Sequence, residues 1–177
     1  MDTTLKNKTA LVTGGTKGIG YGIAIALLKT GMRVMITGRT DASVQEAINN
    51  IPQVYQTDVI GKVANVTDLE ALEACKNEMM DKWGSVDVLI ANAGVGHFAA
   101  IDEMTSDQWN ETIDVNLTGV FNSVKACVEE IKKSSGYIIT IASLAGTNFF
   151  SRGAAYNASK FGLVGFTQAI MLDLRDY

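Results

Sequence analysis

Three side chains in the last quarter of the sequence have the types and spacing needed to transfer a proton to a carbonyl oxygen. Tyr156 and Lys160 are four residues apart, so they share one face of a helix, and Ser143 lies thirteen residues before the tyrosine. A free tyrosine has a pKa near 10, and an ammonium about 4 Å away is expected to lower it by roughly three units before desolvation opposes the effect. Such a tyrosine can serve as a general acid or base near neutral pH. The same pair also occurs on many solvent-facing helices, so it needs support from other residues.

A second group of residues near the N-terminus has the composition of a phosphate-binding turn. Residues 13–20 read Thr-Gly-Gly-Thr-Lys-Gly-Ile-Gly, between an apolar run and a helical pattern. Gly14 permits a tight turn, Gly18 lets the backbone approach a pyrophosphate, and Gly20 lets the helix pack against the strand. The helix N-terminus adds free N–H groups and a partial positive charge. The spacing differs from the common Gly-x-Gly-x-x-Gly fingerprint and lacks the ending of a P-loop.

We interpret this segment as a dinucleotide site, in preference to a purely structural glycine-rich turn. The predicted cofactor contacts in it are Gly14, Thr16, Lys17, Gly18, Ile19 and Gly20.

The residues after the second apolar run indicate which nicotinamide cofactor is preferred. Sites for NAD usually place a carboxylate there to hold the ribose hydroxyls, but this sequence has Gly38 followed by Arg39. Arg39 offers a planar donor fork suited to a 2′-phosphate, and Lys17 could add a second positive charge. We therefore predict that NADP(H) is preferred and that NAD(H) is possible. The alternative is that both are ordinary solvated cations.

Two further polar residues occupy positions that suit a site. Ser143 follows the apolar run at residues 137–142, at the carboxyl end where doubly wound sheets bind ligands, and its hydroxyl can hold a substrate carbonyl beside the tyrosine. Asn116 lies within a long predicted helix, where asparagine is unfavourable. Either its position is neutral and exposed, or its amide holds water or backbone in place.

The elements that would position these residues alternate along the chain. Apolar runs predict strands at residues 9–13, 33–37, 59–64, 86–91 and 137–142. Helical patterns lie at residues 18–30 and 41–50, from Thr67 to Trp83, from Thr105 towards Lys133, and at residues 155–176. We expect Asp41 as an N-cap, and capping boxes at Thr67 with Glu70 and at Thr105 with Gln108. Strands apolar on both faces, separated by helices, predict a doubly wound parallel sheet (Rossmann-like α/β) with helices on both faces, in one domain over residues 1–177.

Composition excludes several other classes of protein. The chain has 177 residues, of which 47% are hydrophobic and 19% charged, and a net charge of −4. That suits one soluble domain and offers no basic surface for nucleic acid or a membrane. Residues 1–6 lack an apolar signal region, and Cys75 and Cys127 have no partners at metal-binding spacing. We expect reduced thiols, no metal site and a cytoplasmic protein.

These motifs together resemble the short-chain dehydrogenases/reductases over residues 8–177. The resemblance rests on the glycine turn, Asn92-Ala93-Gly94, Asn116, Ser143 and the Tyr156-x-x-x-Lys160 pair. It implies that Tyr156 is the general acid in reduction, and that Lys160 binds the nicotinamide ribose and lowers the tyrosine pKa. Ser143 would orient the carbonyl and Asn116 would hold a proton-relay water.

The same resemblance extends to other positions in the sequence. Residues 92–94 would line the cofactor cleft, and Asn65-Val66 stand where the family usually has Asp-Val beside the adenine. The pair Gly38-Arg39 resembles the NADP-preferring members. The long helices at residues 106–133 and 155–176 resemble those that pack between subunits, which implies a homodimer or homotetramer.

Family members continue beyond the tyrosine helix with two more strands and a segment over the substrate, whereas this sequence stops at Tyr177. If Tyr177 is the true C-terminus, residues 138–142 form an exposed apolar edge; we favour instead a chain that is truncated relative to the family. The predicted activity is hydride transfer between NADP(H) and a small carbonyl or secondary alcohol. The alternatives are a non-catalytic NAD(P)-binding module, for which the missing segment argues, and a structural domain without a ligand, which the three glycines disfavour. The sequence does not identify the substrate.

Overall fold

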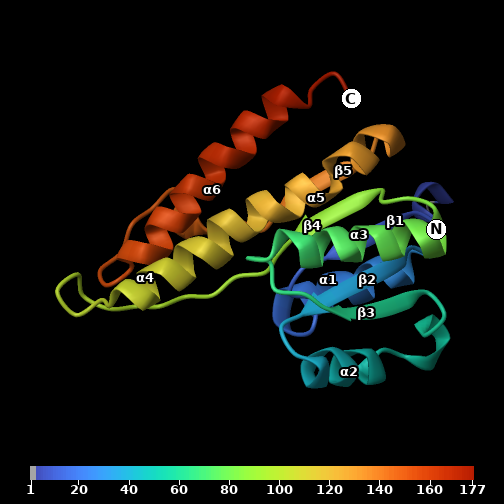
Figure 1. The fold of residues 1–177 in the computed structure, drawn as a ribbon, viewed down its shortest axis with the longest axis horizontal. Helices are drawn as coiled ribbons and strands as arrows, with labels where there is room; N and C mark the ends of the chain where they lie inside the picture. The colour runs from blue at the N-terminus through green and yellow to red at the C-terminus, as the bar shows by residue number, and fades with distance from the viewer. Residues whose placement is uncertain (1–2) are drawn as a thin grey trace.

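The five apolar runs form the five parallel strands of one sheet in the computed structural model, which describes residues 3–177 (Figure 1). The strand order is β3-β2-β1-β4-β5. The bounds are Thr9–Val12 for β1, Arg33–Gly38 for β2, Val59–Val63 for β3, Val88–Ala91 for β4 and Tyr137–Thr140 for β5. The predicted Rossmann-like fold class is confirmed. Residues 1 and 2 of the segment without an apolar signal region lie outside the described residues.

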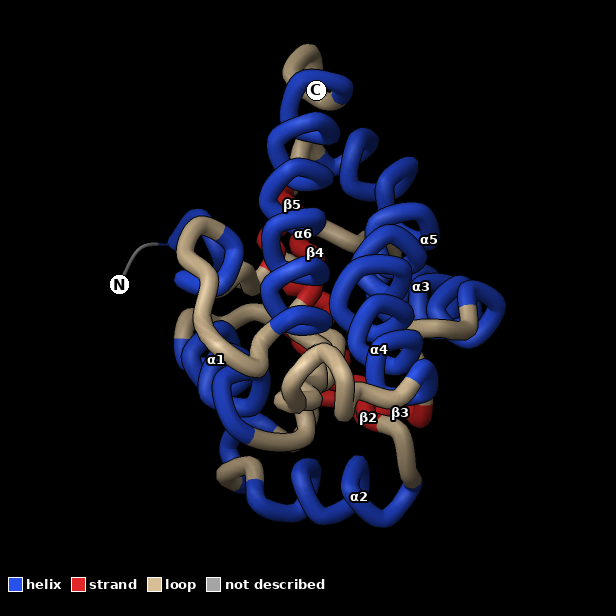
Figure 2. Tube along the Cα trace, turned by 90° about the vertical axis from the view of Figure 1, so that its left-hand side faces the viewer, coloured by secondary structure: helices blue, strands red, loops and turns tan. Residues whose placement is uncertain are grey.

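Side chains alternate between two core layers along the central strands. Leu11 and Leu89 face a layer built with α3 (Leu69–Trp83) and α5 (Gly119–Ser134). Val12 and Ile90 face the opposite layer, built with α1 (Gly18–Lys29) and α2 (Asp41–Asn50). Because both faces of the central strands are covered, these strands are mostly apolar on both faces. Figure 2 shows α1 and α3 on opposite sides of the strands.

Two of the three predicted helix starts are shifted by one residue. Thr40, not Asp41, caps α2, since its side chain accepts a hydrogen bond from the Ser43 amide. Asp68, not Thr67, caps α3 by accepting from the Ala71 amide at 3.1 Å. The reason is local, because the Asn65 side chain accepts from the Thr67 amide and holds that residue in a turn before the helix.

The third predicted start, the capping box of Thr105 and Gln108, is present with both of its hydrogen bonds. The helix that it opens is not uniform. It runs as α4 (Ser106–Ile113), widens into one π-helical turn at Asp114–Thr118, and continues as α5. The predicted single helix is therefore interrupted at the turn that contains Asn116. The last helix, α6, spans Ala154–Asp173; it packs against α4 and the π-helical turn, and its later turns run apart from α5 (Figure 1).

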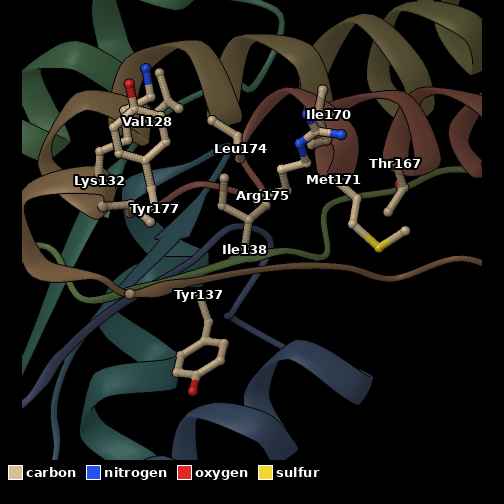
Figure 3. A pocket seen from close by; sticks show the side chains of 12 residues that line it. Val128, Lys132, Tyr137, Ile138, Thr167, Ile170, Met171, Leu174, Arg175 and Tyr177 are labelled. Carbon is tan, nitrogen blue, oxygen red and sulfur yellow. The ribbon is translucent and has the colours of Figure 1, made fainter.

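Among the described residues, strand β5 lies at one edge of the sheet and β3 at the other. Tyr137 is 68% exposed and Ile139 is 47% exposed, so the α1 side of this strand is uncovered in the described residues. On its other side, an apolar cavity of about 310 Å³ lies between α5, β5 and α6 (Figure 3). Because Gly136 and Tyr137 at the start of β5 line this cavity, it lies at the amino end of the sheet, away from the glycine turn.

Both cysteines are buried free thiols in the core layer under α3 and α5. Burial raises the pKa of Cys75 to about 11 and that of Cys127 to about 12, so both act as small apolar side chains. Among residues 3–177, no group of three His, Cys, Asp or Glu side chains is placed to hold a metal. No helix in that range is long and apolar enough to cross a membrane.

Candidate active site

Two glycines in the turn between β1 and α1 adopt backbone conformations that other residues rarely adopt. Gly14 has a φ of 62° and Gly18 a φ of 57°, in the left-handed region that glycine adopts without strain. A Cβ on Gly14 would lie 2.9 Å from the Ala93 Cα, and one on Gly20 would overlap the side-chain amide of Asn92. The turn is therefore pressed against the segment that follows β4, and neither contact leaves room for a side chain.

The first turn of α1 is open towards solvent. Lys17 is its N-cap residue and gives no side-chain hydrogen bond to the helix, so the first N–H groups have no side-chain cap. The space where a Gly18 Cβ would stand is empty to 4 Å. An uncapped helix N-terminus with this access suits an anion such as a phosphate.

This turn forms one wall of the larger of the two cavities described here, of about 650 Å³, at the carboxyl ends of β1, β2 and β4. Twelve residues that the sequence predicted as cofactor contacts line it: Gly14, Thr16, Lys17, Gly18, Ile19, Gly20, Arg39, Asn65, Val66, Asn92, Ala93 and Gly94. The structure thus gathers segments that are up to 80 residues apart in sequence, as Gly14 and Gly94 are. Gly38, Thr40 and Ser43 also line the cavity. Thr40 and Ser43 could have been predicted as lining residues, because they closely follow β2 in the segment that also carries Arg39.

Thr13 is a residue that sequence reasoning passed over, and it fixes the segment after β4. Its hydroxyl accepts hydrogen bonds from the amides of Asn92 and Ala93 at 3.1 and 3.2 Å. The Asn92 side chain donates in return to the carbonyls of Thr13 and Gly14 at 2.9 and 3.1 Å. These four bonds hold two walls of the cavity in register. Thr13 could have been predicted from its hydroxyl, which stands at the end of a buried strand.

Asn116 holds backbone in place, which decides between the two alternatives left open by the sequence. Its side chain is fully buried in the π-helical turn. The amide oxygen accepts from the Val95 N–H at 2.8 Å, and the amide nitrogen donates to the Val95 carbonyl at 2.8 Å and to the Ser159 hydroxyl at 3.1 Å. Asn116 therefore links the segment after β4 to the helix that carries Tyr156.

Lys160 lies one turn after Tyr156 on α6, as the spacing predicted, but its ammonium has another partner. Its Nζ donates to the Ile141 carbonyl at 2.8 Å and lies 5.8 Å from the centroid of the Tyr156 ring. The residue is only 6% exposed, and this burial lowers the pKa of its ammonium. The lysine thus joins the end of β5 to the first turns of α6.

Ser143 begins the turn Leu144–Gly146 that leads from β5 towards α6, and its hydroxyl accepts from the Ala145 amide at 3.1 Å. This turn packs against α6, because a Cβ on Gly146 would lie 2.8 Å from the Lys160 carbonyl oxygen. Buried Asn157 adds hydrogen bonds to the carbonyls of Ala145 and Asn148, both at 2.8 Å. The serine segment is therefore fixed beside the tyrosine helix.

One exposed phenylalanine packs against the Tyr156 ring, and a second packs against the first. The Phe98 ring lies 5.5 Å from the Tyr156 ring and 5.9 Å from the Phe150 ring, measured between centroids. Phe98 and Phe150 are 56% and 46% exposed, and Phe149 is exposed as well. These phenylalanines are not core residues. They give the surface beside Tyr156 an apolar character.

A chain of charged groups stands at the Arg39 side of the cavity. One Glu111 oxygen lies 3.5 Å from Nη1 of Arg39, and the other lies 2.7 Å from Nε2 of His97. His97 is thus held by a carboxylate of α4, in an ion pair when its ring is protonated. This pairing could not be predicted from spacing along the chain, because the three residues come from three different segments.

A doubly wound parallel sheet with a cavity at the glycine turn defines a dinucleotide-binding α/β protein. The sequence matches the short chain dehydrogenase family over residues 8–177, and the chain belongs to that family.

Individual relatives agree with this assignment. The D-beta-hydroxybutyrate dehydrogenase of Cupriavidus necator is 36% identical over 171 residues, which cover 96% of this chain and 66% of that protein. The 3-oxoacyl-(acyl-carrier-protein) reductase of Synechocystis is 36% identical over 173 residues, covering 97% of this chain and 70% of that protein.

A solved structure shares the fold closely. The alcohol dehydrogenase of the archaeon Thermococcus sibiricus, in complex with 5-hydroxy-NADP, superimposes with a TM-score of 0.91 at 26% identity, over 97% of this chain and 73% of that one. The present chain spans about two thirds of the length of the curated relatives that it matches.

Proposed function

We propose that this protein is an oxidoreductase that transfers a hydride between NADP(H) and a carbonyl or secondary alcohol, with Tyr156 as the general acid or base. One observation carries the proposal. Tyr156, Lys160, Ser143 and Asn116 are tied to each other's segments by hydrogen bonds and packing, and Asn116 ties them to the wall of the glycine-turn cavity. The names of the two relatives, a dehydrogenase and a reductase, support it.

The cavity fits a nicotinamide dinucleotide by its shape and its donors. Glycines occupy the positions where the turn packs most closely against the segment after β4. The open N-terminus of α1 offers N–H groups to a pyrophosphate. Asn65 and Val66 line the side of the cavity beyond β3, where the adenine would lie, and residues 92–94 line the other. When bound, the nicotinamide supplies or accepts the hydride.

Arg39 supports a preference for NADP(H) over NAD(H). It lines the cavity directly after β2, and Gly38 before it carries no carboxylate that would repel a 2′-phosphate. Lys17 lines the same cavity and adds a second cation. The bound 5-hydroxy-NADP in the structure of the Thermococcus sibiricus enzyme is consistent with this assignment.

The proton path is assigned to the groups around Tyr156. In reduction, the Tyr156 hydroxyl donates a proton to the developing alkoxide, and the Ser143 hydroxyl holds the same oxygen. The Lys160 ammonium, anchored on the Ile141 carbonyl, places a positive charge 5.8 Å from the centroid of the Tyr156 ring and would hold a ribose hydroxyl of the cofactor. Asn116 fixes the Val95 backbone and contacts Ser159 on the tyrosine helix, and we assign to it the position of a relay water.

The phenylalanines beside Tyr156 favour a substrate whose carbonyl carries an apolar substituent, because Phe98 and Phe150 present exposed ring surface to it. We also propose that residues 1–177 form one domain and that the protein is a cytoplasmic homodimer or homotetramer. Exposed aromatic residues on the long helices, Trp109 on α4 and Phe121 on α5, support contact between subunits.

The decisive test is the Tyr156→Phe variant. We expect NADPH binding to persist while NADPH-dependent reduction of a panel of apolar ketones falls by at least about 100-fold, because only the transferable proton is lost. Binding is measured by NADPH fluorescence and turnover by loss of absorbance at 340 nm.

The matched control is Tyr21→Phe, which makes the same change on α1. Undiminished turnover of Tyr156→Phe would refute the role of the tyrosine. NADPH binding by the unaltered protein without turnover of any ketone would favour the non-catalytic binding module.

A further inference from the structure

Glu111 of α4 holds two side chains from different segments with its two oxygens. Oε2 lies 2.7 Å from the His97 ring nitrogen, and Oε1 lies 3.5 Å from the Arg39 guanidinium. His97 follows β4 and Arg39 follows β2, so the carboxylate stands between the two segments that flank the cofactor cavity. The short contact with His97 fixes the carboxylate on the side of α4 that faces Arg39.

The two cations that line this cavity differ in their partners. Lys17 has no carboxylate within ion-pair distance among residues 3–177, whereas Arg39 has Glu111. The Arg39–Glu111 pair is largely exposed, so its net strength is small. A phosphate group would nevertheless have to share the guanidinium with this carboxylate, and the two anions would repel each other at short range.

We propose that Glu111 determines cofactor specificity by competing with the 2′-phosphate for Arg39, so that it weakens NADP(H) binding and leaves NAD(H) binding unaffected. The inference rests on the proposed role of Arg39 as the 2′-phosphate ligand. Its consequence is that the protein discriminates between the two dinucleotides less strongly than Arg39 alone would allow. Glu111 acts here through Arg39 and does not touch the cofactor itself.

The test compares the dissociation constants of NADPH and NADH for the unaltered protein and its variants, measured by nicotinamide fluorescence at constant ionic strength. We expect Glu111→Gln to bind NADPH about two- to fivefold more tightly, with no change for NADH. Glu111→Ala repeats the test without the new amide. Arg39→Ala should weaken NADPH binding alone, and in that background Glu111→Gln should have no effect.

The matched control is Glu103→Gln, since Glu103 is an exposed carboxylate that pairs with Arg152 and does not line the cavity. It should leave both dissociation constants unchanged, which separates a local competition from a general effect of net charge. Thermal unfolding of every variant establishes that each one is folded.

The outcomes distinguish a failure of the role of Glu111 from a failure of the preference for NADP(H). If Arg39→Ala weakens NADPH selectively but Glu111→Gln changes nothing, or tightens both cofactors equally, the inference about Glu111 is overturned and the cofactor preference stands. A gain that persists without Arg39 also overturns it. If Arg39→Ala affects both cofactors equally or neither, the preference for NADP(H) fails, and the role of Glu111 fails with it.

Discussion

Buried polar side chains position the site at the scale of single residues. Asn116 uses both ends of its amide on the Val95 backbone and on Ser159, so it fixes the cavity wall relative to the tyrosine helix. The Val95 N–H, the Val95 carbonyl and the Ser159 hydroxyl are polar groups with little access to solvent. Leaving such a group unsatisfied costs about 1–3 kcal/mol. Asn116 therefore stabilises the fold and also sets the geometry of the site.

Replacing Asn116 with Ala should lower the free energy of unfolding by about 1–3 kcal/mol, because the Val95 N–H and carbonyl and the Ser159 hydroxyl all lose a partner. Turnover should fall as well. Urea denaturation followed by circular dichroism measures the change.

The control is Asn110→Ala, an exposed asparagine on the adjoining helix α4, for which we expect a change within about 0.5 kcal/mol. Equal losses of unfolding free energy in the two variants would contradict a stabilising role for the hydrogen bonds of Asn116.

At the scale of elements, the site depends on how closely α1 approaches the segment after β4. Gly20 lies in the first turn of α1, and a Cβ there would overlap the Asn92 amide and lie 2.5 Å from the Gly14 carbonyl oxygen. Gly22, two residues later on the same helix, faces open space. The same helix thus offers one glycine required by packing and one that is not.

These two glycines give opposite predictions. Gly20→Ala should destabilise the protein by about 1–3 kcal/mol and weaken NADPH binding, because α1 has to move away from Asn92. Gly22→Ala should stabilise it by up to about 1 kcal/mol, since alanine favours the helix and meets no atoms. Thermal melts and NADPH titrations test both. Similar behaviour of the two variants would contradict the close approach at Gly20.

At the scale of the whole molecule, Asp87 joins the amino ends of β1 and β4, the end of the sheet opposite the site. Burial raises the pKa of this carboxyl, but hydrogen bonds from Lys8, Thr9 and Ser85 outweigh the burial and hold the pKa below its ordinary value. The carboxylate form is therefore favoured by folding. Its contribution to stability is fully present above the unfolded pKa of about 3.9 and is lost as pH falls through the lower folded value.

We therefore expect the unaltered protein to lose stability as the pH drops below about 4, and Asp87→Asn to lose less over the same range while being less stable at pH 7. Urea denaturation at pH 7 and near pH 3 gives the two free energies. Asp102→Asn, at an exposed position, is the comparison. An identical pH dependence in Asp87→Asn and the unaltered protein would mean that this carboxyl is not the source.

The strands and helices, their order along the chain and the residues around the glycine-turn cavity could be predicted from the amino-acid sequence. Local patterns were sufficient for this. Apolar runs set the strands, helical spacing set the helices, and parallel strands bring their carboxyl ends to one edge, where the glycine turn and residues 92–94 meet. The capping box at Thr105 was predictable because both of its members lie within four residues.

The partners that polar groups find in distant segments depended on the tertiary structure. Lys160 donates to the Ile141 carbonyl, and Glu111 joins Arg39 to His97. The π-helical turn that presents Asn116 to Val95 likewise follows from a partner 21 residues away. Spacing along one helix cannot predict such contacts, because they depend on how separate elements pack against one another.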